Sequence, residues 1–423
     1  MSVLLPSRAY RWNFATMGLD VSLFVFALSF ASRYGVLPLF VSHLTPSNLA
    51  LGALPALQAI GLLPPLFVAA YTERLPRKQP FVLVVTVFER VPFLVLAVAT
   101  PFLALSNPAP LLWLTFAMLT VNTLAAGVAN PAWLDLIARM MPDDWRGRFF
   151  GYAFAVGGLL GVAGSAGAAY FLRQYDWVIG CALCFAATFV VMIASFLCLV
   201  AGREPVPVVA DRPTIAPLRL RERVPTVLRE DRNLRWYLVA AVLITGAGAA
   251  TAFFTVDAKR TLALSDGEAG TYAILLLVAS TVGNVLWGYA GDRYGHKRVL
   301  ELGAVISGLA PALALFARDA ATTAEWGRVG YAGVFLLVGL GTSAVQITAL
   351  TFVVDFAPPD ARPTYIGLAT LVQLPFAFGA PLLAAALADW QGYGAVYAAT
   401  TALALAGALV TARRVRDPRV SPV

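Results

Sequence analysis

Residues 176–201 read DWVIGCALCFAATFVVMIASFLCLVA. After the opening aspartate, this stretch contains no charged residue. A membrane-spanning helix needs about 20 mostly apolar residues, because the hydrocarbon layer is about 30 Å thick and a helix rises about 1.5 Å per residue. A membrane-spanning strand needs only about ten alternating residues, whereas this run is continuous and twice as long. The stretch therefore predicts a helix that crosses a lipid bilayer.

The composition of the whole chain agrees with this prediction. Of its 423 residues, 59% are hydrophobic and 13% are charged. Soluble domains are about 45–50% apolar and about 25% charged. The net charge of +8 does not indicate a nucleic-acid-binding protein, because the basic residues separate apolar runs and do not gather on one soluble segment. The composition therefore predicts an integral membrane protein.

Eleven further stretches meet the criterion for a membrane-spanning helix, five before residues 176–201 and six after a polar segment. We therefore predict an all-α integral membrane protein with 12 transmembrane helices in two pseudo-symmetric six-helix bundles. The predicted domains are an N-terminal bundle (1–202), a central loop (203–235) and a C-terminal bundle (236–423). The further stretches are residues 13–41, 49–71, 80–104, 110–140, 149–172, 236–258, 268–290, 299–317, 329–356, 364–388 and 393–411.

The basic residues predict the orientation of the chain. With the N-terminus in the cytoplasm, 24 Lys and Arg residues fall on the cytoplasmic side and 5 on the other side. Arg33 and Arg90 lie inside predicted helices. This asymmetry follows the positive-inside rule and predicts a multi-pass protein of the cell membrane with both termini and the central loop in the cytoplasm. The first helix is expected to stay uncleaved, since its apolar run is too long for a signal peptide.

The two halves of the chain resemble each other at their loops. The segments MPDDWRGRFFG (141–151) and APPDARPTYIG (357–367) share Pro, Arg and Gly at one constant offset of 216 positions. A second correspondence links AAYTERLPRK (69–78) with GYAGDRYGHK (288–297) at an offset of 219 positions. Two similar bundles that rock around a site near the membrane midplane are an architecture of secondary transporters.

The segment 288–297 resembles the signature loop of the major facilitator superfamily. That signature is a Gly, three residues, Asp-Arg, any residue, Gly and two basic residues, and only His296 departs from it. The copy at 69–78 is degenerate at three positions and keeps three basic residues. The motif residues that we predict to act in gating are Glu73, Arg74, Gly288, Asp292, Arg293 and Gly295.

The resemblance implies how this motif acts. In the family, the acidic residue faces the N-terminus of a helix of the other bundle, where it meets the positive end of the helix dipole. We therefore expect Asp292 near Phe149, and Glu73 near Thr364, where Pro363 suits a first helical turn. These contacts are expected to hold the cytoplasmic side closed.

Ionisable residues inside membrane helices are functional candidates, because burying a charge in lipid is costly. Asp20 is the first candidate for proton coupling or substrate contact, and Tyr34 lies two seven-residue repeats further on the same predicted helix face. Asp20 could instead reach the cytoplasmic interface or pair with Arg11. Arg33 could receive an anionic substrate group, extend its side chain outward, or form a structural pair.

Glu89 and Arg90 are adjacent in the third predicted helix and point about 100° apart, so we expect each to pair structurally with neighbours in the same bundle. Asp135 is a further substrate or coupling candidate, and Arg139, four positions later on the same helix, can pair with it.

Uncharged polar residues recur in the fourth and tenth predicted helices, which correspond to each other in the repeat. Such residues either hold helices together or line a wet cavity. We favour the cavity for Asn122, Asn130, Thr342 and Gln346.

The predicted function is alternating-access secondary transport of a small organic solute, coupled to protons, with export favoured. The sequence contains no phosphate-binding loop, and we predict no cofactor, no metal site and no enzymatic activity. The expected partners are the solute, protons and the lipid bilayer, with no nucleic acid, and the protein is expected to be a monomer. The alternatives are a symporter for nutrient uptake and a non-transporting membrane sensor or partner-binding protein with the same fold.

Overall fold

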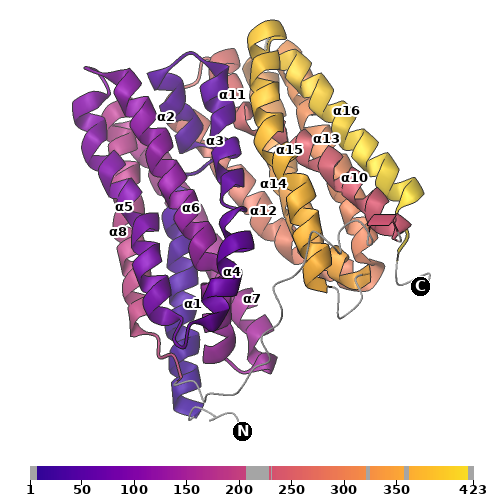
Figure 1. Cartoon of the computed structure of the whole chain (residues 1–423). Helices are drawn as coiled ribbons and strands as arrows, with labels where there is room; N and C mark the ends of the chain where they lie inside the picture. Colours follow the sequence, from indigo (N-terminus) through magenta and orange to yellow (C-terminus); the bar gives the residue numbers. More distant parts are fainter. Residues whose placement is uncertain (1–6, 206–227, 230, 321–323, 357–361, 418–423) are drawn as a thin grey trace. The chain divides into compact units, whose positions relative to one another are not determined.

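The computed structural model describes residues 7–205, 228–229, 231–320, 324–356 and 362–417, and every regular element in these ranges is a helix (Figure 1). Within these ranges, twelve helical stretches are long and apolar enough to cross a membrane. The predicted all-α fold with twelve membrane spans is therefore confirmed.

Most helices overlap the predicted ranges, and three predicted ranges are interrupted as described below. The bounds of the helices are α1 (Ser7–Phe30), α2 (Val36–Leu44), α3 (Asn48–Ile60), α4 (Pro64–Arg74), α5 (Gln79–Leu103), α6 (Pro108–Met140), α7 (Asp143–Gln174), α8 (Trp177–Ala201), α10 (Arg232–Ala247), the 3₁₀ helix η1 (Gly248–Ala252), α11 (Phe254–Leu262), α12 (Asp266–Tyr294), α13 (His296–Ala320), α14 (Ala324–Phe356), α15 (Arg362–Gln391) and α16 (Tyr393–Arg414).

Residues beside the apolar runs explain where several helices begin. The Asp176 carboxylate accepts hydrogen bonds from the backbone N–H groups of Val178 and Ile179, at 2.9 and 3.1 Å, and so caps α8. Ser265 and Glu268 form a reciprocal capping box at the start of α12. Such caps satisfy N–H groups that have no partner within the helix.

The prediction of one continuous helix over residues 13–41 is wrong. Helix α1 ends at Phe30, a turn follows, and α2 begins at Val36. Arg33 and Tyr34 lie in this turn and not inside a membrane helix, so Tyr34 does not continue the helical face of Asp20. A sliding average of hydropathy passes over a turn of five residues when apolar residues flank it on both sides.

Two other predicted helices are also interrupted. A turn at residues 61–63 separates α3 from α4, and Pro64 follows it at once. Leu63 itself has α-region angles (φ −76°, ψ −49°), but Pro64 has no backbone N–H and cannot continue the hydrogen-bond ladder of the preceding helix, which accounts for the break. The seventh membrane-spanning stretch changes from α10 to η1 at Gly248 and becomes helical again at Phe254.

The chain divides into two compact units, which are described separately. Unit 1 contains Met1–Ser32 and Leu57–Pro217, and unit 2 contains Arg33–Ala56 and Leu218–Val423. The domain limits inferred from the sequence stay a prediction. Most of the predicted central loop and residues 357–361 of the second repeat copy lie outside the described residues.

In unit 1, α1 packs mainly against α7 and α8, and α5 packs against α6 and α8. Helices α1 and α7 approach closely, since a Cβ atom added to Gly167 would lie 2.8 Å from the ring of Phe30. Small residues allow such close approach between membrane helices. Helix α8 therefore packs against both α1 and α5.

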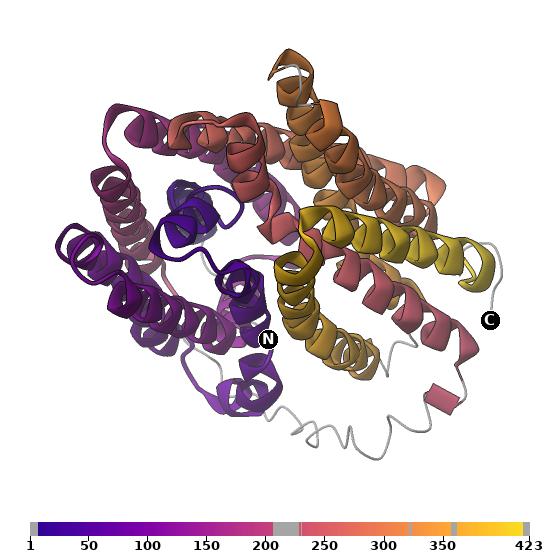
Figure 2. The ribbon, with the colours of Figure 1, turned by 90° about the horizontal axis from the view of Figure 1, so that it is seen from above.

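In unit 2, α13 packs against α14 and α16, and α12 packs against α14. Helix α16 also packs along α10, and the two run side by side in both views (Figures 1 and 2). Tyr237, Phe352 and Tyr365 are buried where α10, α14 and α15 meet. The core of unit 2 thus fixes the helices that surround the pocket described below.

Large apolar side chains are exposed along the helices, as expected for lipid-facing surfaces. Phe102, Trp113 and Leu383 have exposed fractions of 75%, 73% and 73%. Extended apolar surface of this kind is rare on soluble monomers and favourable in lipid.

Candidate functional site

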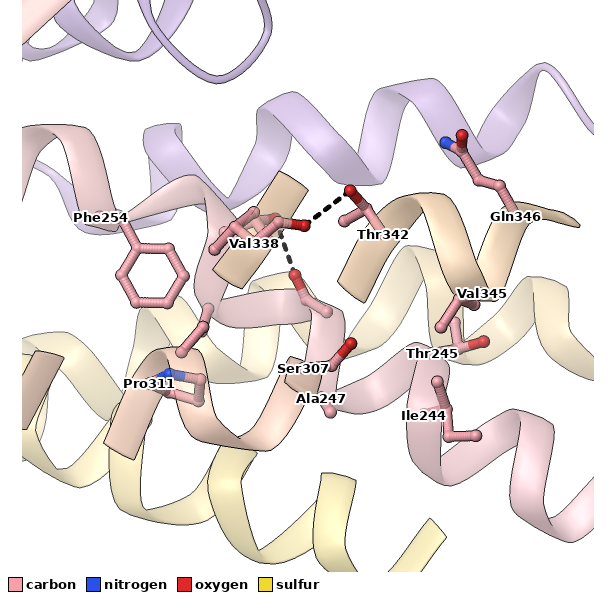
Figure 3. A pocket seen from close by; sticks show the side chains of 14 residues that line it. Ile244, Thr245, Ala247, Phe254, Ser307, Pro311, Val338, Thr342, Val345 and Gln346 are labelled. Atoms are coloured by element: carbon pink, nitrogen blue, oxygen red, sulfur yellow. Dashed lines mark hydrogen bonds between the residues drawn. The ribbon is translucent and has the colours of Figure 1, made fainter. Parts of the chain in front are cut away.

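Unit 2 contains a pocket of about 170 Å³ (Figure 3). Phe254 and Gln346 lie at opposite ends of the pocket in this view. None of its fourteen described lining residues is charged. These residues are Ile244, Thr245, Ala247, Gly248, Ala250, Thr251, Phe254, Ser307, Ala310, Pro311, Val338, Thr342, Val345 and Gln346.

The pocket lies where the seventh membrane span is interrupted. Gly248, Ala250 and Thr251 belong to η1 and line the pocket directly. A 3₁₀ segment within a long helix often marks a functional hinge. The 3₁₀ segment therefore forms part of the pocket wall, although the hydropathy of this region predicts a continuous membrane-spanning α-helix.

Two predicted substrate residues, Thr342 and Gln346, both line this pocket. They are four residues apart on α14 and therefore share one face of that helix. The Thr342 hydroxyl donates to the carbonyl oxygen of Val338 at 2.7 Å, and the Gln346 side chain is exposed. Their role in substrate contact stays a prediction.

Unit 1 contains a second polar site, a buried group of Asp20, Glu89, Arg90 and Ser195 that we call the Asp20 cluster. The Ser195 hydroxyl donates to Asp20 at 2.6 Å, and Arg90 lies 3.4 Å from the same hydroxyl oxygen. Arg90 also forms an ion pair with Glu89 at 3.7 Å. All four residues are at most 6% exposed. The cluster thus holds two carboxyl groups and one guanidinium group inside the membrane-spanning part of unit 1.

The Asp20 cluster draws on three helices, since α1 supplies Asp20, α5 supplies Glu89 and Arg90, and α8 supplies Ser195. Arg90 contacts α8 of its own unit, where it donates to the Met192 backbone oxygen at 3.0 Å, and it also lies 3.7 Å from the adjacent Glu89. Of the two asparagines predicted on α6, Asn122 donates to the backbone oxygen of Glu89 at 2.7 Å, whereas the Asn130 side chain is exposed. Asn122 therefore lies beside the cluster and helps to join α6 to α5.

Asp135 lies in a different network, next to the loop between α4 and α5. Its carboxylate is 3.0 Å from Arg139 and 3.3 Å from the amine of Lys78, and Arg139 is 3.3 Å from Glu204. The buried Lys78 amine also donates to the backbone oxygens of Thr72 and Glu73 in the last turn of α4. Burial lowers the pKa of Lys78, while Asp135 opposes that shift. The first-half copy of the motif therefore ends on a buried cation.

The second-half copy surrounds the end of α12. Gly295 ends this helix with φ +92°, a conformation that favours glycine. Asp292 and Arg293 are exposed, and Arg293 donates to the Tyr289 hydroxyl at 2.9 Å. Gly288 precedes them on the same helix, and no neighbouring atom lies within 4 Å of a Cβ atom added to it.

The gating contacts expected from the motif stay predictions. Glu73 and Arg74 are exposed at the end of α4. The side chain of Thr364, the expected neighbour of Glu73, lies outside the described residues. Helix α15 begins at Arg362, so Pro363 does occupy its first turn, as the sequence indicated.

Unit 2 also contains a buried carboxylate that was not predicted from the sequence. Asp257 is 1% exposed and accepts hydrogen bonds from the Tyr331 and Tyr397 hydroxyls at 2.7 and 2.9 Å. It also pairs with Arg318. The available signal was an aspartate within predicted helix 236–258, one residue before its end. Phe254 lines the pocket, and its ring stacks on Tyr397 at 5.1 Å between ring centroids. Asp257 and its tyrosine partners therefore lie behind the Phe254 end of the pocket.

The segment Arg33–Ala56 packs within unit 2 through polar contacts. His43 lies 2.8 Å from Asp266, and the Tyr34 backbone oxygen accepts a hydrogen bond from the Thr255 hydroxyl. The Arg33 guanidinium lies over the Tyr34 ring at 5.1 Å. Neither Arg33 nor Tyr34 is among the residues that line the pocket.

The chain is similar to known proteins in part of its sequence and in its fold. The family model described as the Major Facilitator Superfamily matches residues 237–423. A solved structure titled D-xylose-proton symporter superposes with a TM-score of 0.72 at 15% identity, covering 97% of this chain and 99% of that one. At this identity the likeness concerns the fold.

Two curated proteins match shorter parts of the chain. A gentisate transporter of Corynebacterium glutamicum is 32% identical over 125 residues, which are 30% of this chain and 26% of the relative. The ESX-3 secretion system protein EccD3 of Mycobacterium tuberculosis is 38% identical over 132 residues, 29% of this chain and 27% of that protein. The chain thus spans about a quarter of the length of each of these relatives.

Proposed function

We propose that the chain is a transporter of the major facilitator superfamily, whose family model matches residues 237–423, and that it moves a small organic solute the size of a single ring by alternating access coupled to protons. The observation that carries this proposal is the uncharged pocket beside the interrupted seventh span. In secondary transporters, substrate sites form where membrane helices are discontinuous.

The size of the pocket supports a solute with a single ring. An engineered apolar cavity of about 150 Å³ binds benzene. The pocket here has a volume of about 170 Å³ and walls that include Ile244, Phe254 and Val338. The name of the gentisate transporter among the relatives is consistent with a solute of this size.

The Asp20 cluster supports coupling to protons. With every group ionised, Asp20, Glu89 and Arg90 together carry one negative charge inside the membrane. An uncompensated buried charge costs several kcal/mol, so binding of one proton stabilises the cluster. We propose that Asp20 takes up and releases this proton. The Ser195 hydroxyl beside it can donate a hydrogen bond to the ionised carboxylate and accept one from the protonated carboxyl group.

We propose export as the direction of transport. The pocket presents apolar walls and no charge, which suits the removal of an apolar or amphipathic compound that has entered the membrane or cytoplasm. Uptake by symport and a non-transporting role remain the outcomes against which the experiment is designed.

The test uses the protein in proteoliposomes that contain a pH-sensitive dye. Single-ring compounds, with hydroquinone as a neutral probe and gentisate as an acidic one, are added against imposed pH gradients of either sign. We expect proton movement that requires both protein and solute. Asp20→Asn should abolish the proton movement while solute exchange without a gradient continues. Asp389→Asn, which alters an exposed carboxylate at the end of α15, is the matched control and should behave as the unaltered protein.

Each part of the proposal has a result that contradicts it. The absence of solute-dependent proton movement with any compound would remove the transport proposal. Proton movement in Asp20→Asn equal to that of the unaltered protein would remove Asp20 from the coupling. Solute accumulation with the sign of symport would replace export by uptake.

A further inference from the structure

Two threonine hydroxyl groups in the pocket donate their hydrogens to the protein backbone. Thr342 contacts the carbonyl oxygen of Val338 at 2.7 Å, and Thr251 contacts that of Gly248 at 2.8 Å. A carbonyl oxygen has no hydrogen to give, so each threonine hydroxyl must be the donor in its contact. Both hydroxyls keep lone pairs that can accept a hydrogen bond from a ligand.

The third threonine of the pocket behaves in the same way. Thr245 lies 3.2 Å from the side-chain oxygen Oε1 of Gln373. The amide nitrogen of Gln373 donates to the backbone oxygen of Ala369 at 3.1 Å, which fixes the orientation of the amide and makes its oxygen the group facing Thr245. Thr245 is therefore also a donor to the protein, and its remaining capacity is that of an acceptor.

Two polar side chains of the pocket can both donate and accept. Ser307 has no hydrogen-bond partner among the described residues, and its hydroxyl can turn toward a ligand. Gln346 offers an amide at the end opposite Phe254 (Figure 3). The pocket thus offers five side chains that can accept a hydrogen bond from a ligand and two that can donate one, which matches a ligand that supplies hydrogens.

The pocket is also unsuited to an ion. None of its described lining residues can neutralise a charge, and transfer of an unpaired ionised group into an apolar site is strongly unfavourable. Arg318, a cation of unit 2 near the Phe254 end, is already paired with Asp257. A carboxylate would therefore bind here more weakly than a neutral molecule of the same size.

We infer that the pocket selects an uncharged, single-ring compound that carries a hydroxyl group and donates its hydrogen to the threonine oxygens. This inference rests on the proposed transport function, since it names the chemical class of the solute. It differs from transport itself in that it concerns equilibrium binding, which needs no gradient.

The test measures binding to the full chain in lipid nanodiscs, with empty nanodiscs subtracted. The probes are phenol, fluorobenzene, which has a similar size without a hydrogen to donate, and benzoate, which carries a charge. We expect phenol to bind about two- to tenfold more tightly than fluorobenzene, the range that one net hydrogen bond provides. Benzoate should bind more weakly than either.

Substitutions of Thr342 in α14 test whether its hydroxyl accepts the hydrogen bond from the ligand. Thr342→Val should remove most of the phenol preference over fluorobenzene, whereas Thr342→Ser, which keeps the hydroxyl, should retain it. Thr348→Val is the matched control, because Thr348 lies on the same helix, donates to the backbone oxygen of Ala344 at 2.8 Å in the same manner, and does not line the pocket. It should keep the preference.

Three results would overturn the inference: benzoate binding as tightly as phenol, no preference for phenol over fluorobenzene, or a preference that Thr342→Val leaves intact. Binding that follows the expected pattern without any gradient-driven proton movement would support the pocket chemistry and contradict the transport proposal. Proton-coupled transport of gentisate without any preference for phenol over fluorobenzene would support the transport proposal and contradict the pocket chemistry.

Discussion

Replacement of Arg318 by Met is expected to lower the free energy of unfolding by about 3 kcal/mol, because it leaves the Asp257 carboxylate charged in a buried site. Arg318 comes from α13 and Asp257 from α11, so the ion pair joins two helices of unit 2. The carboxylate is 1% exposed and cannot recover its hydration by a small movement.

The magnitude follows from what remains around the carboxylate. Removal of one partner of a buried ion pair costs about 3–5 kcal/mol. The Tyr331 and Tyr397 hydroxyls, at 2.7 and 2.9 Å, continue to donate to Asp257 after the substitution. The Arg318 side chain is also about a third exposed, so part of its own interaction is with solvent. Both facts place the loss at the lower end of the range.

A second substitution separates the charge from the packing. Asp257→Asn removes the charge and keeps the shape, so in the Asp257→Asn/Arg318→Met double variant no charge is left without a partner. We expect that double variant to lose only about 1 kcal/mol relative to the unaltered protein, the net contribution of one or two weakened hydrogen bonds. The double variant should therefore be more stable than Arg318→Met alone.

The assay is unfolding in mixed detergent and dodecyl sulfate, analysed as a double-mutant cycle. Arg328→Met is the matched control, because Arg328 is 56% exposed and pairs with Glu268 at 3.6 Å, and its loss should stay within about 0.5 kcal/mol. A loss below about 1 kcal/mol in Arg318→Met, or a double variant no more stable than that single variant, would refute the reasoning.

Gly295→Ala should lower the free energy of unfolding by about 1–3 kcal/mol, because Gly295 has φ +92° and an added Cβ atom would lie 2.9 Å from an Asp417 oxygen. Gly288→Ala is the control, since the added atom meets no neighbour within 4 Å, and it should be neutral or stabilising. Equal stability of the two variants in thermal unfolding would contradict this prediction. For Lys78, burial lowers the pKa from its ordinary 10.5, so the unfolded chain binds more protons than the folded chain in the window between the lowered value and 10.5. Stability should therefore rise with pH in that window, and the rise should be smaller in Lys78→Met; identical slopes for the two proteins would count against the burial of this amine.

The positions of the membrane spans could be predicted from the sequence. Each span must satisfy its own backbone in hydrocarbon, so length and apolarity suffice to locate it. The interruptions at residues 31–35 and 61–63 were missed, because they lie within apolar surroundings that an averaged hydropathy does not resolve. Arg33 and Tyr34 were consequently placed inside a helix that ends before them.

For the candidate site, the sequence indicated some of the polar residues but not their partners. Asp20, Thr342 and Gln346 could be singled out as polar residues in apolar helices, since such residues are costly in lipid wherever they occur. Their partners could not be predicted. Ser195 lies 175 positions from Asp20 in the chain, and Arg90 reaches the same hydroxyl from another helix.

The sequence by itself determined that this chain is a membrane protein, that it has twelve membrane spans, and which loops resemble those of a transporter family, because these properties depend on each segment alone. Only the tertiary structure decided that Asp20 shares a buried cluster with Glu89 and Arg90, and that the pocket is uncharged. Those properties depend on which helices pack together, and packing in lipid is set by close steric fit between side chains distant in the sequence.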